Sequence, residues 1–150
     1  MVAPRGAPAT PYGLAMISST PAAKMARALA RHSAGIICTS GCPSSEIPRL
    51  ILNGQLDQAK EVAKWYRDVF GDRFYFELQE HDLTELAPIT PTLVALSREM
   101  GIPLVATNDV HYVRKEDASA QDLMLCIQTN TLYKDVKRMR MNNDSYYLKS

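Results

Sequence analysis

The chain has 150 residues, of which 46% are hydrophobic and 22% charged, and its formal net charge is +1. This composition is that of an ordinary globular protein, long enough for one domain with its own core. The near-zero charge gives no bulk electrostatic argument for nucleic acid or a membrane surface. No apolar run reaches membrane-spanning length. Three cysteines do not make a disulfide framework, so we expect a reducing, cytoplasmic location.

The first 21 residues differ from the rest of the chain. They are rich in Ala, Pro and Ser, carry no acid, and have prolines at positions 4, 8, 11 and 21 that interrupt any signal-peptide core. We expect residues 1–21 to be an unstructured or mis-started leader, with a transit peptide as the alternative. Residues 22–150 are expected to form the folded domain, and Ala22–His32 its first helix.

Turn signals separate the next elements. Residues 35–39 are predicted as a brief apolar strand that ends in the turn Ser40–Pro43, and Pro48 suits the first turn of a short helix through Leu52. A second helix is predicted from apolar residues at helical spacing up to Gly71 (Leu56, Ala59, Ala63, Tyr66 and Phe70). Alternation over 74–79 predicts a half-buried strand, followed by a polar loop over 80–89.

The second half repeats the order helix, strand, helix. Thr90 and Pro91 suit an N-cap and first helical position, and Gly101 a helix end. Residues 102–107 predict a buried strand, and a later helix has one apolar face (Ala120, Leu123, Met124 and Ile127). This alternation predicts an α/β fold with about three parallel strands and right-handed crossovers, part of a barrel or open sheet. Chemistry in such folds lies beyond the carboxyl ends of the strands.

Potential metal ligands follow the last predicted strand. Asp109 and His111 are spaced i and i+2, so in an extended chain both side chains project to the same side. A carboxylate and an imidazole suit a divalent ion such as Zn or Mn. Cys42 follows the first predicted strand and is expected at the same rim. The alternative is a polar loop in which Asp109 caps a turn and His111 is solvated.

Several long stretches resemble one known family. They are Thr39–Pro48, Phe70–Gln79, Met100–Tyr112, Asp122–Thr129 and Tyr146–Ser150. In this order they resemble the PHP (polymerase and histidinol phosphatase) domain of the bacterial DNA polymerase III alpha subunit. The resemblance implies a partial (β/α) barrel of the PHP type with divalent metals at its rim. It gives metal-ligand roles to Cys42, Asp109 and His111.

Two neighbours could support these ligands. Asn108 could orient a ligand as a hydrogen-bond donor, although a turn residue is the simpler interpretation. Glu46 could reach the metal rim, but a carboxylate near a helix amino terminus is equally explained by the helix dipole. The resemblance assigns no catalytic residue to this chain and no small-molecule cofactor.

The front of the family pattern is missing. The resemblance implies an opening His-x-His pair, whereas the only histidines here are His32, His81 and His111. We therefore expect the carboxyl-terminal part of a PHP barrel, truncated at both ends, with an incomplete metal site. The polymerase palm would lie beyond Ser150.

The resemblance implies a fragment of a replicative DNA polymerase III alpha subunit, a DNA-directed DNA polymerase and nucleotidyltransferase of DNA replication. The fragment is expected to be inactive alone and to reach DNA and replisome subunits through its parent. One alternative is a PHP-type phosphoesterase or 3′–5′ exonuclease that depends on a metal. Another is a metal-free structural scaffold.

The remaining residues with reactive or charged side chains have simpler interpretations. Cys38, Cys126, Trp65 and Tyr66 are expected in the core rather than in a site. His81 is expected to be solvated in its polar loop. A basic cluster near the carboxyl end is expected to be a solvated face, with phosphate contact as the alternative (Lys134, Lys137, Arg138 and Arg140).

Overall fold

The computed structural model describes residues 28–79, 81 and 84–149, and the leader predicted for residues 1–21 lies outside them. Residues 28–32 are helical, whereas the start of the helix predicted for Ala22–His32 also lies outside the described part. The described residues fall into two compact units. The first unit holds residues 28–78 and 84–105, and the second holds residues 79, 81 and 106–149.

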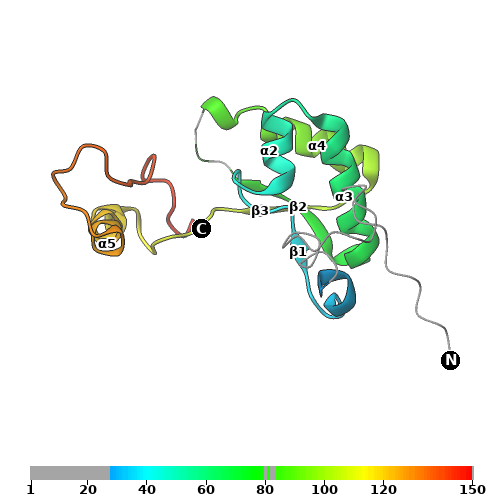
Figure 1. The fold of residues 1–150 in the computed structure, drawn as a ribbon, viewed down its shortest axis with the longest axis horizontal. Helices are drawn as coiled ribbons and strands as arrows, with labels where there is room; N and C mark the ends of the chain where they lie inside the picture. The colour runs from blue at the N-terminus through cyan, green and yellow to red at the C-terminus, as the bar shows by residue number, and fades with distance from the viewer. Residues whose placement is uncertain (1–27, 80, 82–83, 150) are drawn as a thin grey trace, which may run out of the picture. The chain divides into compact units, whose positions relative to one another are not determined.

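Strands and helices alternate along the chain as predicted (Figure 1). The order is β1 (Cys38–Thr39), α2 (Glu46–Leu52), α3 (Leu56–Phe70), β2 (Phe74–Gln79), α4 (Ile89–Met100), β3 (Leu104–Thr107) and α5 (Ala118–Thr129). The three parallel strands form an open sheet in the order β1-β2-β3, with Cys38 opposite Phe74 in the first pair. The predicted α/β class with about three parallel strands that alternate with helices is confirmed, and an open sheet of this kind agrees with the predicted partial barrel.

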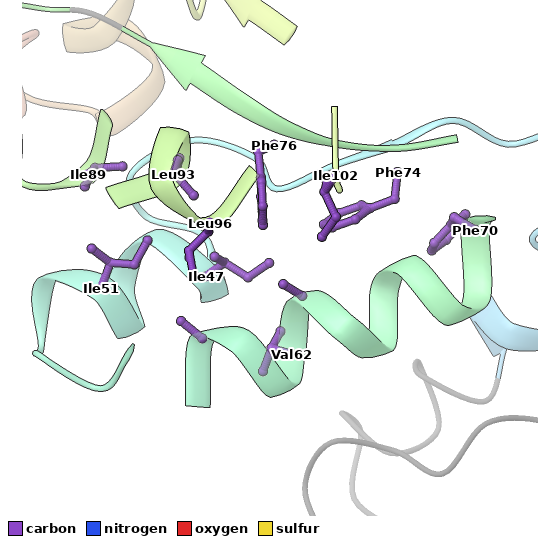
Figure 2. Packing of buried hydrophobic residues seen from close by; sticks show 12 residues of the cluster. Ile47, Ile51, Val62, Phe70, Phe74, Phe76, Ile89, Leu93, Leu96 and Ile102 are labelled. Carbon is purple, nitrogen blue, oxygen red and sulfur yellow. The ribbon is translucent and has the colours of Figure 1, made fainter. Parts of the chain in front are cut away.

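The core of the first unit lies where α2, α3 and α4 meet β2. Figure 2 shows side chains from these elements converging on one cluster. Phe74 and Phe76 are fully buried in β2 and meet edge to face, with 5.8 Å between ring centroids. Trp65 is buried and Tyr66 packs against the cluster, so their predicted place in the core is confirmed. Burial of such rings supplies a large share of the hydrophobic stabilisation.

Helix α4 begins earlier than predicted. It starts at Ile89 with Pro88 before it, so the prediction of Thr90 as N-cap and Pro91 as first helical residue was wrong by about half a turn. Pro91 is tolerated there because the first-turn N–H groups of a helix have no intrahelical acceptor. Thr92 reaches back instead, and its hydroxyl donates to the Pro88 carbonyl at 2.7 Å. The helix ends at Gly101 as predicted, in a left-handed conformation.

The predicted burial of the last strand was wrong. Three of the four residues of β3 are exposed, and only Ile102 before it is fully buried. In the described sheet β3 is the strand beyond β2, so its outer edge has no further strand to cover it. The residue pattern was apolar, but apolar composition alone does not report whether a neighbouring strand is present.

In the second unit, an ion pair joins α5 to the segment that follows it. The Arg138 guanidinium donates to both carboxylate oxygens of Asp122 at 2.5 Å, and its Nε donates to the Tyr133 carbonyl at 3.0 Å. Arg138 is buried, so its prediction as part of a solvated basic face was wrong. The pairing explains this burial, because a buried guanidinium needs an anion and several acceptors.

The apolar face predicted for α5 does not face the core. Leu123, Met124 and Ile127 are exposed, whereas Leu125 and Cys126 on the opposite side of the helix are buried. The helix is therefore apolar on two faces, and the periodicity could not tell which one packs within this chain. Burial of Cys126 is confirmed, and Cys38 is half-buried at the edge of the first unit's core.

Candidate metal-binding residues

Cys42 lies in a tight turn between β1 and α2 in the first unit. Gly41 before it has a φ of 77°, and the Ser45 N–H donates to the Cys42 carbonyl at 2.8 Å. The Cys42 Sγ lies 3.8 Å from the Ser45 Oγ, within sulfur hydrogen-bond range. A Cβ on Gly41 would lie only 2.3 Å from that same Oγ. The turn thus requires glycine at 41, and it places the Cys42 thiol beside a hydroxyl.

Glu46 is the first residue of α2, and its carboxylate contacts Tyr66 of α3. Burial raises the pKa of Glu46, and the hydrogen bond from the Tyr66 hydroxyl partly opposes this shift. Burial also raises the pKa of Tyr66, to about 12, and the nearby charge of Glu46 adds to this increase. The Glu46 carboxylate therefore forms a hydrogen bond that links α2 to α3.

Asp109 and His111 lie in the second unit, beyond the end of β3. Asp109 has a φ of 46°, so the chain is not extended here and the predicted strand alternation of the two side chains was wrong. His111 contacts the backbone of Asp109, with 2.6 Å between its Nδ1 and the Asp109 carbonyl oxygen. A carbonyl can only accept, so Nδ1 carries the proton in the neutral ring. Nε2 then holds the lone pair that a metal ion would use.

Asn108 fastens this loop to the carboxyl-terminal segment. Its amide nitrogen donates to the carbonyls of Ser145 at 2.9 Å and Tyr147 at 2.6 Å. The N–H of His111 donates to the Tyr146 carbonyl at 2.9 Å, and Tyr112 forms a parallel bridge with Tyr147. Both amide hydrogens of Asn108 are therefore used by backbone carbonyls.

Tyr146 stands between two histidines. Its ring stacks on His81, with centroids 4.2 Å apart, and meets the His111 ring edge to face at 5.5 Å. The pKa of Tyr146 is raised by its burial and then by the nearby charge of Asp109. His81 is only 4% exposed, so its prediction as a solvated loop residue was wrong. The polar neighbours of His81 in sequence concealed this, because the aromatic partner lies far along the chain.

The donor types fit a divalent metal only in part. A thiolate, a carboxylate and an imidazole suit zinc, and the tautomer of His111 leaves the correct nitrogen available. The hydroxyl of Tyr112, the residue after His111, is buried and meets no hydrogen-bonding partner among the described residues. Across that part of the chain, however, no three His, Cys, Asp or Glu side chains gather into a group that could hold a metal ion. The described residues do not make a complete site.

Comparison with known proteins confirms the resemblance. The PHP domain family matches residues 14–81. The DNA polymerase III subunit alpha of Borreliella burgdorferi is 45% identical over 122 residues, which are 81% of this chain and 11% of that protein. The subunit of Thermus aquaticus is 43% identical over 122 residues, 81% of this chain and 10% of that protein. The subunit of Mycobacterium tuberculosis H37Rv is 39% identical over 126 residues, which are 83% of this chain and 11% of that protein.

Residues 14–81 of the chain are therefore similar to the PHP domain family. Its homologues are DNA polymerase III alpha subunits, and it spans about a tenth of the length of the curated relatives it matches. Among the described residues, no helix is both long and apolar enough to cross a membrane.

Proposed function

We propose that this chain contributes the carboxyl-terminal part of a PHP domain to a replicative DNA polymerase III alpha subunit. Its role there is mainly structural, and it has no polymerase activity of its own. Contact with DNA and with other replisome subunits, in the cytoplasm, comes through the whole polymerase. The observation that carries this proposal is the alignment with alpha subunits over four fifths of the chain, which includes residues from both units.

Cys42, Asp109 and His111 are the ligands that this part of the domain would supply to a divalent ion, Zn or Mn. Support comes from their donor chemistry and from the Nδ1–H of His111, which leaves Nε2 free of the proton. Bound at such a rim, the ion would act as a Lewis acid toward phosphate oxygens. The protein's own residues fix the ligands: Ser45 lies against the Cys42 thiol, and the Asp109 carbonyl orients His111.

Metal titration of the purified chain tests this proposal. We expect Zn²⁺ or Mn²⁺ to bind weakly, at micromolar level or above, because the ligand set is incomplete. Cys42→Ala and His111→Ala should each abolish the binding heat in calorimetry. Asp109→Asn is the sharpest variant, since Asn tolerates the left-handed backbone of Asp109 and removes only the charge.

Cys126→Ala is the matched control, because this thiol is buried on α5 and should not affect binding. If neither metal binds to the unmodified chain, the metal role is wrong and the scaffold function alone remains. Manganese-dependent release of nucleotides from a DNA 3′ end, lost in Asp109→Asn, would contradict the structural role and support an exonuclease instead.

A further inference from the structure

The loop that carries His111 is held from one side by the carboxyl-terminal segment. The main chain of His111 donates to the Tyr146 carbonyl, and the His111 ring rests edge-on against the Tyr146 ring. The Asp109 carbonyl holds Nδ1 from within the loop. The His111 ring is thus held by the Asp109 carbonyl and the Tyr146 ring, and its backbone is held by the Tyr146 carbonyl. These contacts limit the rotation of the side chain, although His111 is exposed.

Tyr146 is itself held rigidly. It is 6% exposed and stacks on His81. The flanking Ser145 hydroxyl lies 2.9 Å from His81 Nδ1 and donates to the Asn143 Oδ1 at 2.6 Å. Because a hydroxyl has one proton, Ser145 must accept from His81, whose Nδ1 is therefore protonated.

A second bond closes this network into a ring. The Asn143 amide nitrogen donates to the His81 carbonyl at 2.5 Å, which fixes the orientation of the Asn143 side chain. The Asn143 Oδ1 then accepts from both the N–H and the hydroxyl of Ser145. The donors and acceptors of His81, Asn143 and Ser145 are thus mutually consistent, and the Tyr146 ring stacks on His81, a member of this network.

We propose that Tyr146 is a positioning residue for His111, which orients the imidazole so that Nε2 faces outward as a neutral donor atom. This inference rests on the proposed function of His111 as a metal ligand. No local sequence pattern indicates this role, because Tyr146 lies 35 positions from His111. Only the parallel pairing of the two segments brings the rings together.

The tautomer of His111 in the metal-free chain is the direct readout. Long-range ¹H–¹⁵N correlation spectra at about pH 8, where an ordinary histidine is neutral, distinguish Nδ1–H from Nε2–H. The unmodified chain should show Nδ1–H. Tyr146→Ala should shift the equilibrium toward Nε2–H, which predominates in free neutral histidine. It should also weaken Zn²⁺ binding by about tenfold or more.

Two variants separate positioning from a general effect on folding. Tyr146→Phe keeps the ring, so it should retain both the tautomer and the Zn²⁺ affinity. Tyr147→Ala removes the neighbouring tyrosine ring, which contacts Lys149. This variant should leave the tautomer of His111 unchanged. If Tyr146→Ala leaves the tautomer as it is, or if Tyr147→Ala has the same effect, the proposal is wrong.

A measurement on the unmodified chain alone can also refute the proposal. The unmodified chain should show nuclear Overhauser effects between the ring protons of Tyr146 and His111, and their absence would refute the contact even if Tyr146→Ala does not fold. The tautomer is measured without metal. An unmodified chain that binds no Zn²⁺ would therefore overturn the proposed ligand role of His111 while leaving the positioning test intact.

Discussion

Arg138 illustrates how one side chain can organise a segment that has little regular structure. Only 1% of its side chain is exposed, and it contacts the Asp122 carboxylate, the Tyr133 carbonyl and the face of the Tyr133 ring. The hydrogen bonds from Arg138 hold the pKa of Asp122 below its ordinary value of 3.8. A bidentate pair of this kind supplies geometry that a lysine could not reproduce.

We expect Asp122→Asn to lower the thermal midpoint by several degrees at neutral pH, because it leaves the Arg138 charge buried without its anion. The lowered pKa of Asp122 also fixes the pH dependence. Its contribution to stability is fully present above pH 3.8 and is lost as the pH falls through the lower folded-state value. Thermal unfolding followed by circular dichroism from neutral to strongly acidic pH measures both effects.

Lys115→Met is the matched control, since Lys115 forms an ion pair with Asp144 in the same unit but both side chains are more than half exposed. Loss of such a surface pair should change stability by less than about 1 kcal/mol. Equal effects of the two variants would contradict a special role for Arg138.

Tyr66 gives the first unit a different pH dependence. Its pKa is raised to about 12 by burial and by Glu46, whereas an unfolded tyrosine ionises near 10. The contribution of Tyr66 to stability is therefore present below pH 10 and is lost as the pH rises toward 12, because the unfolded chain releases its proton first. Spectrophotometric titration of the folded chain should show one tyrosine that ionises last.

Tyr66→Phe should remove that last ionisation and make the alkaline loss of stability shallower. At neutral pH it should cost about 1 kcal/mol, the usual value of one hydrogen bond to a half-buried partner. Tyr75→Phe, in β2 of the same unit, serves as the control. An unchanged titration curve in Tyr66→Phe would show that the late ionisation belongs to another residue.

At the scale of elements, the sequence predicted the type of each helix and strand, because turn residues and apolar spacing agree along most of the chain. Gly71 and Gly101 end helices in the positive-φ conformations that glycine adopts readily. The predictions failed where a distant partner decides the outcome. The apolar strand β3 is exposed because it lies at an edge of the described sheet, and His81 is buried, despite its polar neighbours in sequence, because its ring stacks on Tyr146.

In the candidate metal site, too, the residue types could be predicted from local sequence and the geometry could not. The ligand-type residues could be read from their positions after strands and from the family motifs. Their geometry could not, since Asp109 leaves the extended conformation and the Asn108 amide is taken up by carbonyls 37 and 39 positions away. Long-range backbone pairing of this kind has no local sequence signal.

The turn at Gly41 provides a test at this scale. Gly41→Ala should destabilise the chain by more than about 1 kcal/mol, because the φ of 77° disfavours a side chain and the new Cβ would clash with Ser45. Chemical denaturation measures the difference. Gly54→Ala is the control: its φ of 71° is nearly the same, but a Cβ there meets no atom within 4 Å.

The excess cost of Gly41→Ala over Gly54→Ala isolates the steric contribution of Ser45. Equal costs for the two variants would show that backbone strain alone accounts for the glycine and that the Ser45 hydroxyl moves aside freely.

At the scale of the whole chain, the two units differ in how well they cover their apolar residues. The first unit buries twelve residues in one cluster. The second buries few large apolar side chains (Tyr112, Leu125 and Tyr146) and exposes many (Val110, Val113, Leu123, Met124, Ile127, Leu132, Tyr133, Val136, Met139 and Leu148). Exposed apolar surface of this extent favours association.

We therefore expect the purified chain to self-associate in a concentration-dependent manner, and Ile127→Lys on the exposed face of α5 to reduce the association. Ile127 is 74% exposed, so a charge there should not disturb folding. Light scattering after size-exclusion chromatography measures the mass. Gln128→Lys adds the same charge at the next exposed position and should have a smaller effect. A monomeric chain at high concentration would contradict the expectation.

The double hydrogen bond of Asn108 also has a consequence for the order in which the protein acquires its structure during synthesis. The first unit packs α2 against α3, neighbours in sequence, and can form this contact early. The second unit is closed by residues 143–148, which the ribosome delivers last of the described segment. Closing loops of this length lowers the conformational entropy of the chain before the stabilising contacts form. The His111 loop can therefore reach its final geometry only after Tyr147 has left the exit tunnel, later in synthesis than the emergence of the first unit, which ends at Val105.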